Sequence, residues 1–149
     1  MRRPGSFYSE GFKLDGDLFF PVDLKNGETR SGIVLCHGYT GVKDLYLPDT
    51  AVALNQAGYV VLTFDYKGWG KSEGQRSRLA PFSRMADVLA ALTFLGIQPE
   101  VKKDSLGIYG TSYGCATVVY AAARRKSKVH GRGDWNGAWR ALDAKRPTP

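Results

Sequence analysis

The sequence predicts an α/β fold with a mostly parallel sheet, flanking helices, an N-terminal β-hairpin and a disordered basic C-terminal tail. Two observations lead to this prediction. Three short apolar runs show no alternation of polar and apolar residues, which is typical of strands buried on both faces of a parallel sheet. The segments between these runs carry apolar residues at helical spacing. Strands that alternate with helices in this way indicate βαβ units with right-handed crossovers.

The hairpin is the first expected element and lies within residues 12–24. Asp15-Gly16 is a strong two-residue turn signal between two short stretches that contain apolar residues. A second turn is expected at Asn26-Gly27. The first buried strand, Ile33–Cys36, follows and ends in the glycine-punctuated loop His37–Gly41.

A helix over Asp44–Gln56 is expected next. Its apolar residues recur at helical spacing, and Gly58 stands in the position expected just past a helix end. The second buried strand is then Tyr59–Phe64. A long glycine-rich loop, Asp65–Gly74, follows that strand.

The remaining expected elements surround a serine. An amphipathic helix over Pro81–Leu95 leads to the third buried strand, Leu106–Tyr109. A turn with Ser112 at its apex comes next, and a helix is expected over the small and apolar residues Cys115–Ala123. Because the carboxyl ends of parallel strands lie at one edge of a sheet, the loops that follow the three strands should meet there.

The turn at Ser112 has the pattern Gly-x-Ser-x-Gly between a strand and a helix. A serine hydroxyl is a weak nucleophile, and it becomes reactive when a sharp turn holds Oγ clear of the backbone beside a general base. Gly110 and Gly114 are expected where the strand and the helix pass too close for a Cβ atom. Since Gly/Ser-rich loops also produce this pattern, the surrounding motifs decide its interpretation.

Three motifs in this order resemble the α/β-hydrolase family. They are His-Gly-Tyr-Thr-Gly after the first buried strand, Asp-x-Lys-Gly-x-Gly-x-Ser after the second and Gly-Thr-Ser-Tyr-Gly after the third. The resemblance is greatest to esterase and serine-peptidase-like members and covers residues 12–123, the N-terminal half of that fold. It implies hydrolysis of a small-molecule ester or amide through an acyl-serine intermediate, without a metal or another cofactor.

The resemblance also implies roles for particular residues. Ser112 would be the nucleophile, and the backbone N–H groups of Tyr39 and Tyr113 would form the oxyanion hole. Five residues would support the loops of the site: His37, Gly38, Asp65, Gly110 and Gly114. His37 precedes the serine, whereas the catalytic histidine of the family follows it, so we do not expect His37 to be the general base. Lys67 departs from the arginine usual at its position and lacks the planar fork of a guanidinium.

The acid and the histidine that the family places after the serine have only weak counterparts in this sequence. The later candidates are His130, Asp134 and Asp143, in a segment with neither a period of two nor a buried apolar run. We interpret His130 as a solvated histidine of a basic segment and Ala138–Leu142 as a short helical turn.

These features predict two regions. Residues 1–123 would form the N-terminal half of an α/β-hydrolase domain, and residues 124–149 a basic tail of low order. We therefore expect a truncated hydrolase, with a reading-frame change or an aberrant stop near Ala123. Truncation would leave Leu106–Tyr109 as an exposed sheet edge, so we expect self-association through that edge.

Charge and composition narrow the class of protein further. The net charge is +7, but residues 1–123 carry 13 basic against 12 acidic side chains, whereas residues 124–149 carry 8 against 2. The excess belongs to the tail, and no recognition motif accompanies it, so we do not expect nucleic acid as a partner. Cys36 and Cys115 lie in apolar segments, as reduced core thiols of a cytoplasmic protein do. No signal peptide or 18-residue apolar span is evident, so we expect no membrane partner.

The sequence therefore predicts a serine hydrolase that lacks the acid and the histidine of its triad. Two alternatives stay open. One is a catalytically inactive fragment that serves as a self-associating interaction protein. The other is a nucleic-acid binder that uses the basic tail together with Trp135 and Trp139.

Overall fold

The structure, a computed structural model, describes residues 1–124, 131–134 and 138–141. Its centre is a parallel trio of strands with β3 (Arg30–Cys36) between β4 (Val60–Phe64) and β5 (Val101–Thr111). The strands on either side of the trio run antiparallel, and the whole sheet has the order β1-β2-β4-β3-β5-β7-β6. The predicted α/β class is confirmed, and the parallel part of the sheet is this central trio.

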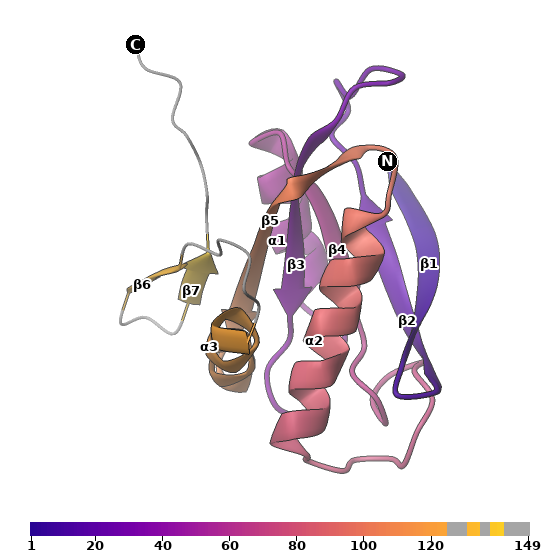
Figure 1. The fold of residues 1–149 in the computed structure, drawn as a ribbon, viewed down its shortest axis with the longest axis vertical. Coiled ribbons are helices and arrows are strands. Elements are labelled where there is room, and N and C mark those ends of the chain that lie inside the picture. The colour runs from indigo at the N-terminus through magenta and orange to yellow at the C-terminus, as the bar shows by residue number, and fades with distance from the viewer. Residues whose placement is uncertain (125–130, 135–137, 142–149) are drawn as a thin grey trace.

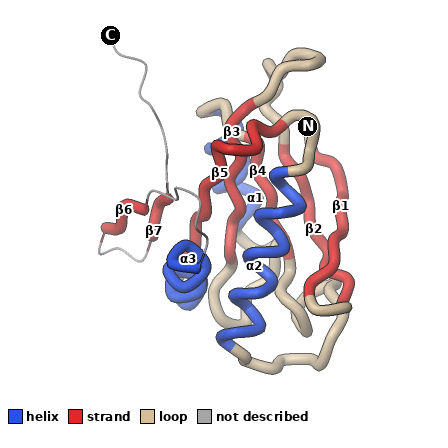
Figure 2. The backbone as a smooth tube through the Cα atoms, in the orientation of Figure 1, coloured by secondary structure: helices blue, strands red, loops and turns tan. Residues whose placement is uncertain are grey.

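Helices cover both faces of the central strands (Figures 1 and 2). On one face lie α2 (Pro81–Gly96) and α3 (Tyr113–Arg124), and α1 (Leu47–Gln56) lies on the other. Successive residues of β3 point to opposite faces: Val34 packs in the cluster with α2 and α3, and Leu35 in the cluster with α1. Since both positions are fully buried, β3 needs an apolar residue at each.

The predicted N-terminal hairpin exists, but its turn lies earlier than expected. Strands β1 (Arg2–Ser9) and β2 (Phe12–Phe19) are joined by Glu10 and Gly11. Both turn residues have positive φ, 47° and 83°, as a two-residue turn of this hand requires. The expected turn at Asp15-Gly16 is wrong, because these residues lie inside β2, opposite Ser6 and Gly5.

The other side of the sheet also differs from the prediction. The short strands β6 (Gly131–Asp134) and β7 (Ala138–Ala141) occur where no strand was expected, and β7 replaces the helical turn predicted for Ala138–Leu142. Strand β7 pairs with β5 from Tyr109 to Thr111. The prediction that the outer side of β5 is unpaired is therefore wrong at Tyr109. Residues 125–130, 135–137 and 142–149, which include His130 and Asp143, lie outside the described part of the chain.

Both cysteines are buried, as the sequence predicts. Neither cysteine takes part in a disulfide, and burial raises the pKa of Cys36 to about 12. Among the described residues, no helix is long and apolar enough to cross a membrane.

Candidate active site

Ser112 lies at the apex of the turn between β5 and α3. Its side chain is exposed and its φ is +51°, a left-handed conformation that is strained for a residue with a Cβ atom. The turn is closed by a bond outside the helix, in which the N–H of Cys115 donates to the carbonyl of Ser112 at 2.9 Å. The chain therefore holds a strained, solvent-facing serine at the end of a central parallel strand.

The two glycines of the motif lie where backbones approach each other closely. A Cβ atom on Gly114 would lie 2.5 Å from the carbonyl oxygen of Cys36 and 2.9 Å from that of His37. A Cβ atom on Gly110 would lie 2.6 Å from the carbonyl carbon of Gly114. Because all of these are backbone atoms, the neighbours cannot move aside as a flexible side chain would. The glycines let α3 start directly against the end of β3.

The loop after β3 lies next to the serine. A Cβ atom on Gly38 would be 3.2 Å from the Cβ of Ser112, which places this loop against the turn. The Gly38 N–H donates to the hydroxyl of Tyr46 at 2.8 Å, and that hydroxyl is 2.7 Å from Oγ1 of Thr111. Tyr46 thus ties the loop to the residue that precedes Ser112. No motif in the sequence marks this role, because the hydrogen-bond partner of Tyr46 is 65 positions away.

The rings of the two expected oxyanion residues lie near each other. Tyr39 is 6.3 Å from Tyr113 between ring centroids and 5.7 Å from Trp69, in edge-to-face arrangements. Tyr113 is the first residue of α3, so its N–H has no acceptor within that helix. The positive end of the α3 dipole lies at the same place.

His37 is fully buried beneath this loop. Its Nδ1 lies 2.8 Å from the carbonyl oxygen of Gly38 and donates to it, which leaves Nε2 as the unprotonated nitrogen of the neutral ring. The ring packs edge-to-face on Tyr66 at 4.8 Å. Burial, helped by the nearby charge of Arg84, lowers the pKa of His37 to about 4, so the ring is neutral near pH 7.

Asp65 joins two loops at the end of β4. One carboxylate oxygen accepts the Lys43 N–H at 2.7 Å, and the other accepts the Lys71 N–H at 2.9 Å. Burial raises the pKa of Asp65, although both backbone bonds oppose that rise. A Cβ atom on Gly70 would lie 2.0 Å from Oδ2 of Asp65, so the loop can close around the carboxylate only with glycine there.

The first of these loops is also held by a buried ion pair for which the sequence carries no local signal. Lys43 contacts Asp17 directly and lies 3.2 Å from Asp15 of the same strand. Burial alone would lower the pKa of Lys43, but its pairs with the two carboxylates raise it instead. Arg2 reaches Asp17 as well, at 2.8 Å. The N-terminal hairpin is therefore coupled to the loop that carries Tyr39.

The remaining residues named from the sequence lie at other places. The Lys67 N–H donates to Asp87 in α2 at 3.0 Å, and its ammonium group pairs with Glu10, so this side chain faces the hairpin turn. Asp134 ends β6. Among the described residues, no group of three or more His, Cys, Asp or Glu side chains could hold a metal ion.

A pH dependence of stability follows from His37. Below pH 6.5 the unfolded chain takes up a proton on this histidine, whereas the folded chain does so only near pH 4. Stability is therefore expected to fall as the pH drops from 6.5 to 4, by up to about 3 kcal/mol from this residue. Urea unfolding at pH 7, 5.5 and 4.5 measures the loss. A His37→Gln variant should show a shallower slope, and an unchanged slope would contradict the assignment.

Comparison with known proteins gives the class to which this fold and serine turn belong. Solved structures that resemble this fold include a hypothetical protein of Pseudomonas aeruginosa, with a TM-score of 0.81 and 28% identity. That match covers 87% of this chain and 41% of the other. Another is the Butyrivibrio proteoclasticus protein Est1E with bound ferulic acid, with a TM-score of 0.72 and 27% identity. That match covers 80% of this chain and 47% of the other. The fold is that of the α/β-hydrolases.

The family match is more specific. Residues 27–132 match the family described as Serine aminopeptidase, S33, and the chain belongs to that family. Relatives include an uncharacterized 31.7 kDa protein of Escherichia coli, 38% identical over 62% of this chain and 32% of that protein. The thiohydrolase aneE of Aspergillus aculeatus is 34% identical over 76% of this chain and 34% of its own length. The chain thus spans about a third of the length of these curated relatives, and the family match continues past Ala123.

Proposed function

We propose that this chain carries the nucleophile and the oxyanion loop of a serine hydrolase that acts on esters or amides of small molecules. The observation that carries the proposal is the strained and exposed Ser112, held between β5 and α3 with the loop after β3 against it. Membership in the serine aminopeptidase family supports the same chemistry.

In the proposed reaction, Oγ of Ser112 attacks the substrate carbonyl and a base takes the hydroxyl proton. The negative charge that develops on the carbonyl oxygen is stabilised by the N–H groups of Tyr39 and Tyr113. The intermediate then expels the alcohol or amine, which takes a proton as it leaves, and an acyl-serine ester forms. Water subsequently hydrolyses this ester and regenerates the serine.

The general base is the part of the site that the described residues do not supply. His37 is the only histidine among them, and it is buried with Nδ1 bound to Gly38. We therefore propose that His37, Gly38, Asp65, Gly110 and Gly114 support the loops and that none of them accepts the serine proton. On this basis, this chain alone should react with an activated acyl or phosphonyl donor faster than it turns over an ester.

A fluorophosphonate probe tests the proposal. The serine oxygen bonds to phosphorus, fluoride leaves, and the hydroxyl proton passes to solvent, so no residue beyond the serine is consumed. We expect one probe per chain, and peptide mass mapping should place it on Ser112. Labelling at several serines in proportion to their exposure, or no labelling at all, would contradict an activated nucleophile.

A second expected property is self-association through the outer side of β5. The pairing of β5 with β7 covers only Tyr109 to Thr111, while the apolar run of this strand starts at Leu106. Sedimentation velocity over a range of protein concentrations should show an increase in mean mass. A single monomeric species at all concentrations would exclude this property.

A further inference from the structure

Arg84 is a buried cation that forms no ion pair with any of the described residues. It lies in α2 with 2% of its surface exposed, and none of its three side-chain nitrogens has a hydrogen-bond partner among the described residues. Its guanidinium is 4.4 Å from the ring centroid of Tyr66, 5.3 Å from Trp69 and 5.5 Å from Tyr113. Aromatic rings attract a cation but satisfy none of its N–H groups, so this side chain retains its donors for another group.

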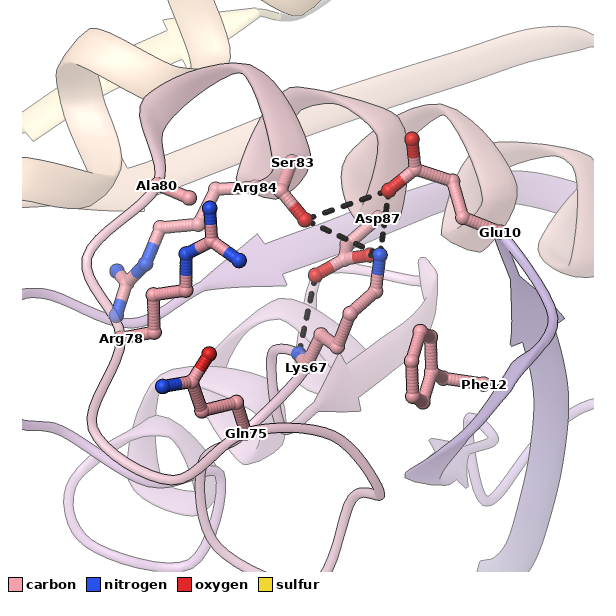
Figure 3. Close-up of a pocket in the computed structure, with 9 residues that line it drawn as sticks. All are labelled: Glu10, Phe12, Lys67, Gln75, Arg78, Ala80, Ser83, Arg84 and Asp87. Carbon is pink, nitrogen blue, oxygen red and sulfur yellow. Dashed lines mark hydrogen bonds and ion pairs between the residues drawn. The ribbon is translucent and has the colours of Figure 1, made fainter.

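Arg84 lines a pocket of about 380 Å³ between the hairpin turn and the start of α2 (Figure 3). Figure 3 shows Arg78 and Arg84 on the side of the pocket away from Phe12. Phe12 is 42% exposed, so it offers an apolar ring on the opposite wall. The full lining consists of Glu10, Phe12, Lys67, Gln75, Arg78, Ala80, Ser83, Arg84 and Asp87.

The acidic groups of the pocket both lie next to Lys67, and Oδ1 of Asp87 has no hydrogen-bond partner among the described residues. Glu10 binds the ammonium of Lys67 at 2.5 Å, and Asp87 accepts the Lys67 N–H at 3.0 Å and lies 3.8 Å from the same ammonium. Lys67 is thus shared by both carboxylates. Arg78 is exposed and has no ion pair within the described part of the chain. Two guanidinium groups therefore line the pocket without forming an ion pair among the described residues.

We propose that this pocket binds a carboxylate on an apolar stem, with Arg84 and Arg78 holding the carboxylate and Phe12 contacting the stem. The planar fork of a guanidinium matches the two oxygens of a carboxylate. Arg78 and Gln75 are exposed, and exposed side chains change rotamer within nanoseconds, so this wall can open to admit the group. Ser112 does not line this pocket, and the proposal does not rest on the hydrolase chemistry.

The stability of the unliganded protein gives an independent readout. A buried charge without a partner is unfavourable, and its replacement by an apolar side chain of similar length is often neutral or stabilising. Arg84→Met keeps the stem on the aromatic rings and removes the charge. We expect its melting temperature without ligand to equal or exceed that of the wild type, and its response to a carboxylate to be lost. A residue that served only as structural support would show the opposite, a lower melting temperature.

Titration calorimetry with sodium benzoate at constant ionic strength tests the site directly. We expect saturable binding to the wild type, and binding weaker by about tenfold or more for Arg84→Met and for Arg78→Gln. Arg76→Gln is the matched control, since Arg76 is exposed, lies outside the pocket and donates to the carbonyl of Gly70. Arg78→Gln alone carries the test should the Arg84 variant not fold.

Two further ligands define the chemistry of the pocket. Benzamide, which is neutral, should not bind, and inorganic phosphate should bind more weakly than benzoate because it has no stem for Phe12. The proposal would be overturned by the absence of saturable benzoate binding, by equal affinities for benzamide or phosphate, or by binding to both arginine variants as strong as to Arg76→Gln.

Discussion

Replacement of Ser112 with glycine is expected to abolish fluorophosphonate labelling while it raises the free energy of unfolding by up to about 1 kcal/mol. The label is lost because the nucleophilic oxygen is gone. The stability rises because φ at this position is +51°, which glycine adopts without the steric strain of a Cβ atom. Part of that gain is offset, since glycine also increases the entropy of the unfolded chain. A combined loss of reactivity and gain of stability is typical of a residue held in strain for its chemistry.

Two control variants separate the two effects. Ser77 is also exposed, with a φ of +57°, but it lies in the loop before α2. Ser77→Gly should gain similar stability and keep full labelling. Ser112→Ala should lose the label without the gain in stability, because alanine retains the Cβ atom. Residual labelling of Ser112→Gly, or a stability loss of about 1 kcal/mol, would contradict the assignment.

Gly114→Ala is expected to lower the free energy of unfolding by about 3 kcal/mol and to slow labelling of Ser112. In a helix without neighbours this change would stabilise by about 1 kcal/mol, because alanine is the better helix former. Here the new Cβ atom would lie 2.5 Å from the carbonyl oxygen of Cys36, so α3 must move away from β3. That movement would also displace the Tyr113 N–H, which is part of the proposed oxyanion hole.

Gly96→Ala is the matched control for this prediction. Gly96 is the last residue of α2, and a Cβ atom there would lie 3.2 Å from Cδ1 of Leu106, the end of a flexible side chain. The control should change the free energy of unfolding by less than about 0.5 kcal/mol and leave labelling intact. Chemical unfolding together with the initial rate of labelling measures both variants. Equal stability of Gly114→Ala and the wild type would show that the contact between α3 and β3 is loose.

The parts of the fold that could be predicted from sequence are those with a local signal. The buried strands β3 and β4 are continuous apolar runs, and the turn at Ser112 is marked by its two glycines. Strand β1 was missed, because it carries two arginines, Pro4 and Gly5 and lies at a sheet edge. The hairpin turn was misplaced, because Glu10-Gly11 is a weaker turn signal than the Asp15-Gly16 pair that β2 contains.

The supporting residues of the candidate site had no such signal. Tyr46 and Lys43 of the candidate site, and Arg84 of the carboxylate pocket, act through partners that are distant in the sequence. Each is an ordinary residue in its own segment. Arg84 in particular lies in a helix whose amphipathic pattern would place a charged residue in solvent. Only the fold brings it under Trp69 and Tyr66. The chemistry of the nucleophile could therefore be predicted, whereas the network that positions it could not.

The interactions that hold the loops of the site determine how its geometry depends on ionic strength. Tyr46 joins Gly38 to Thr111 through hydrogen bonds between uncharged groups, and Asp65 accepts bonds from backbone N–H groups while it is buried. The Lys43–Asp17 pair is shielded from solvent as well. The Debye length, over which salt screens the interaction between exposed charges, is about 10 Å at 0.1 M and shortens as salt is added. Buried pairs are screened much less. The geometry around Ser112 should therefore persist from dilute buffer to molar salt, whereas surface pairs such as Arg3–Glu100 weaken.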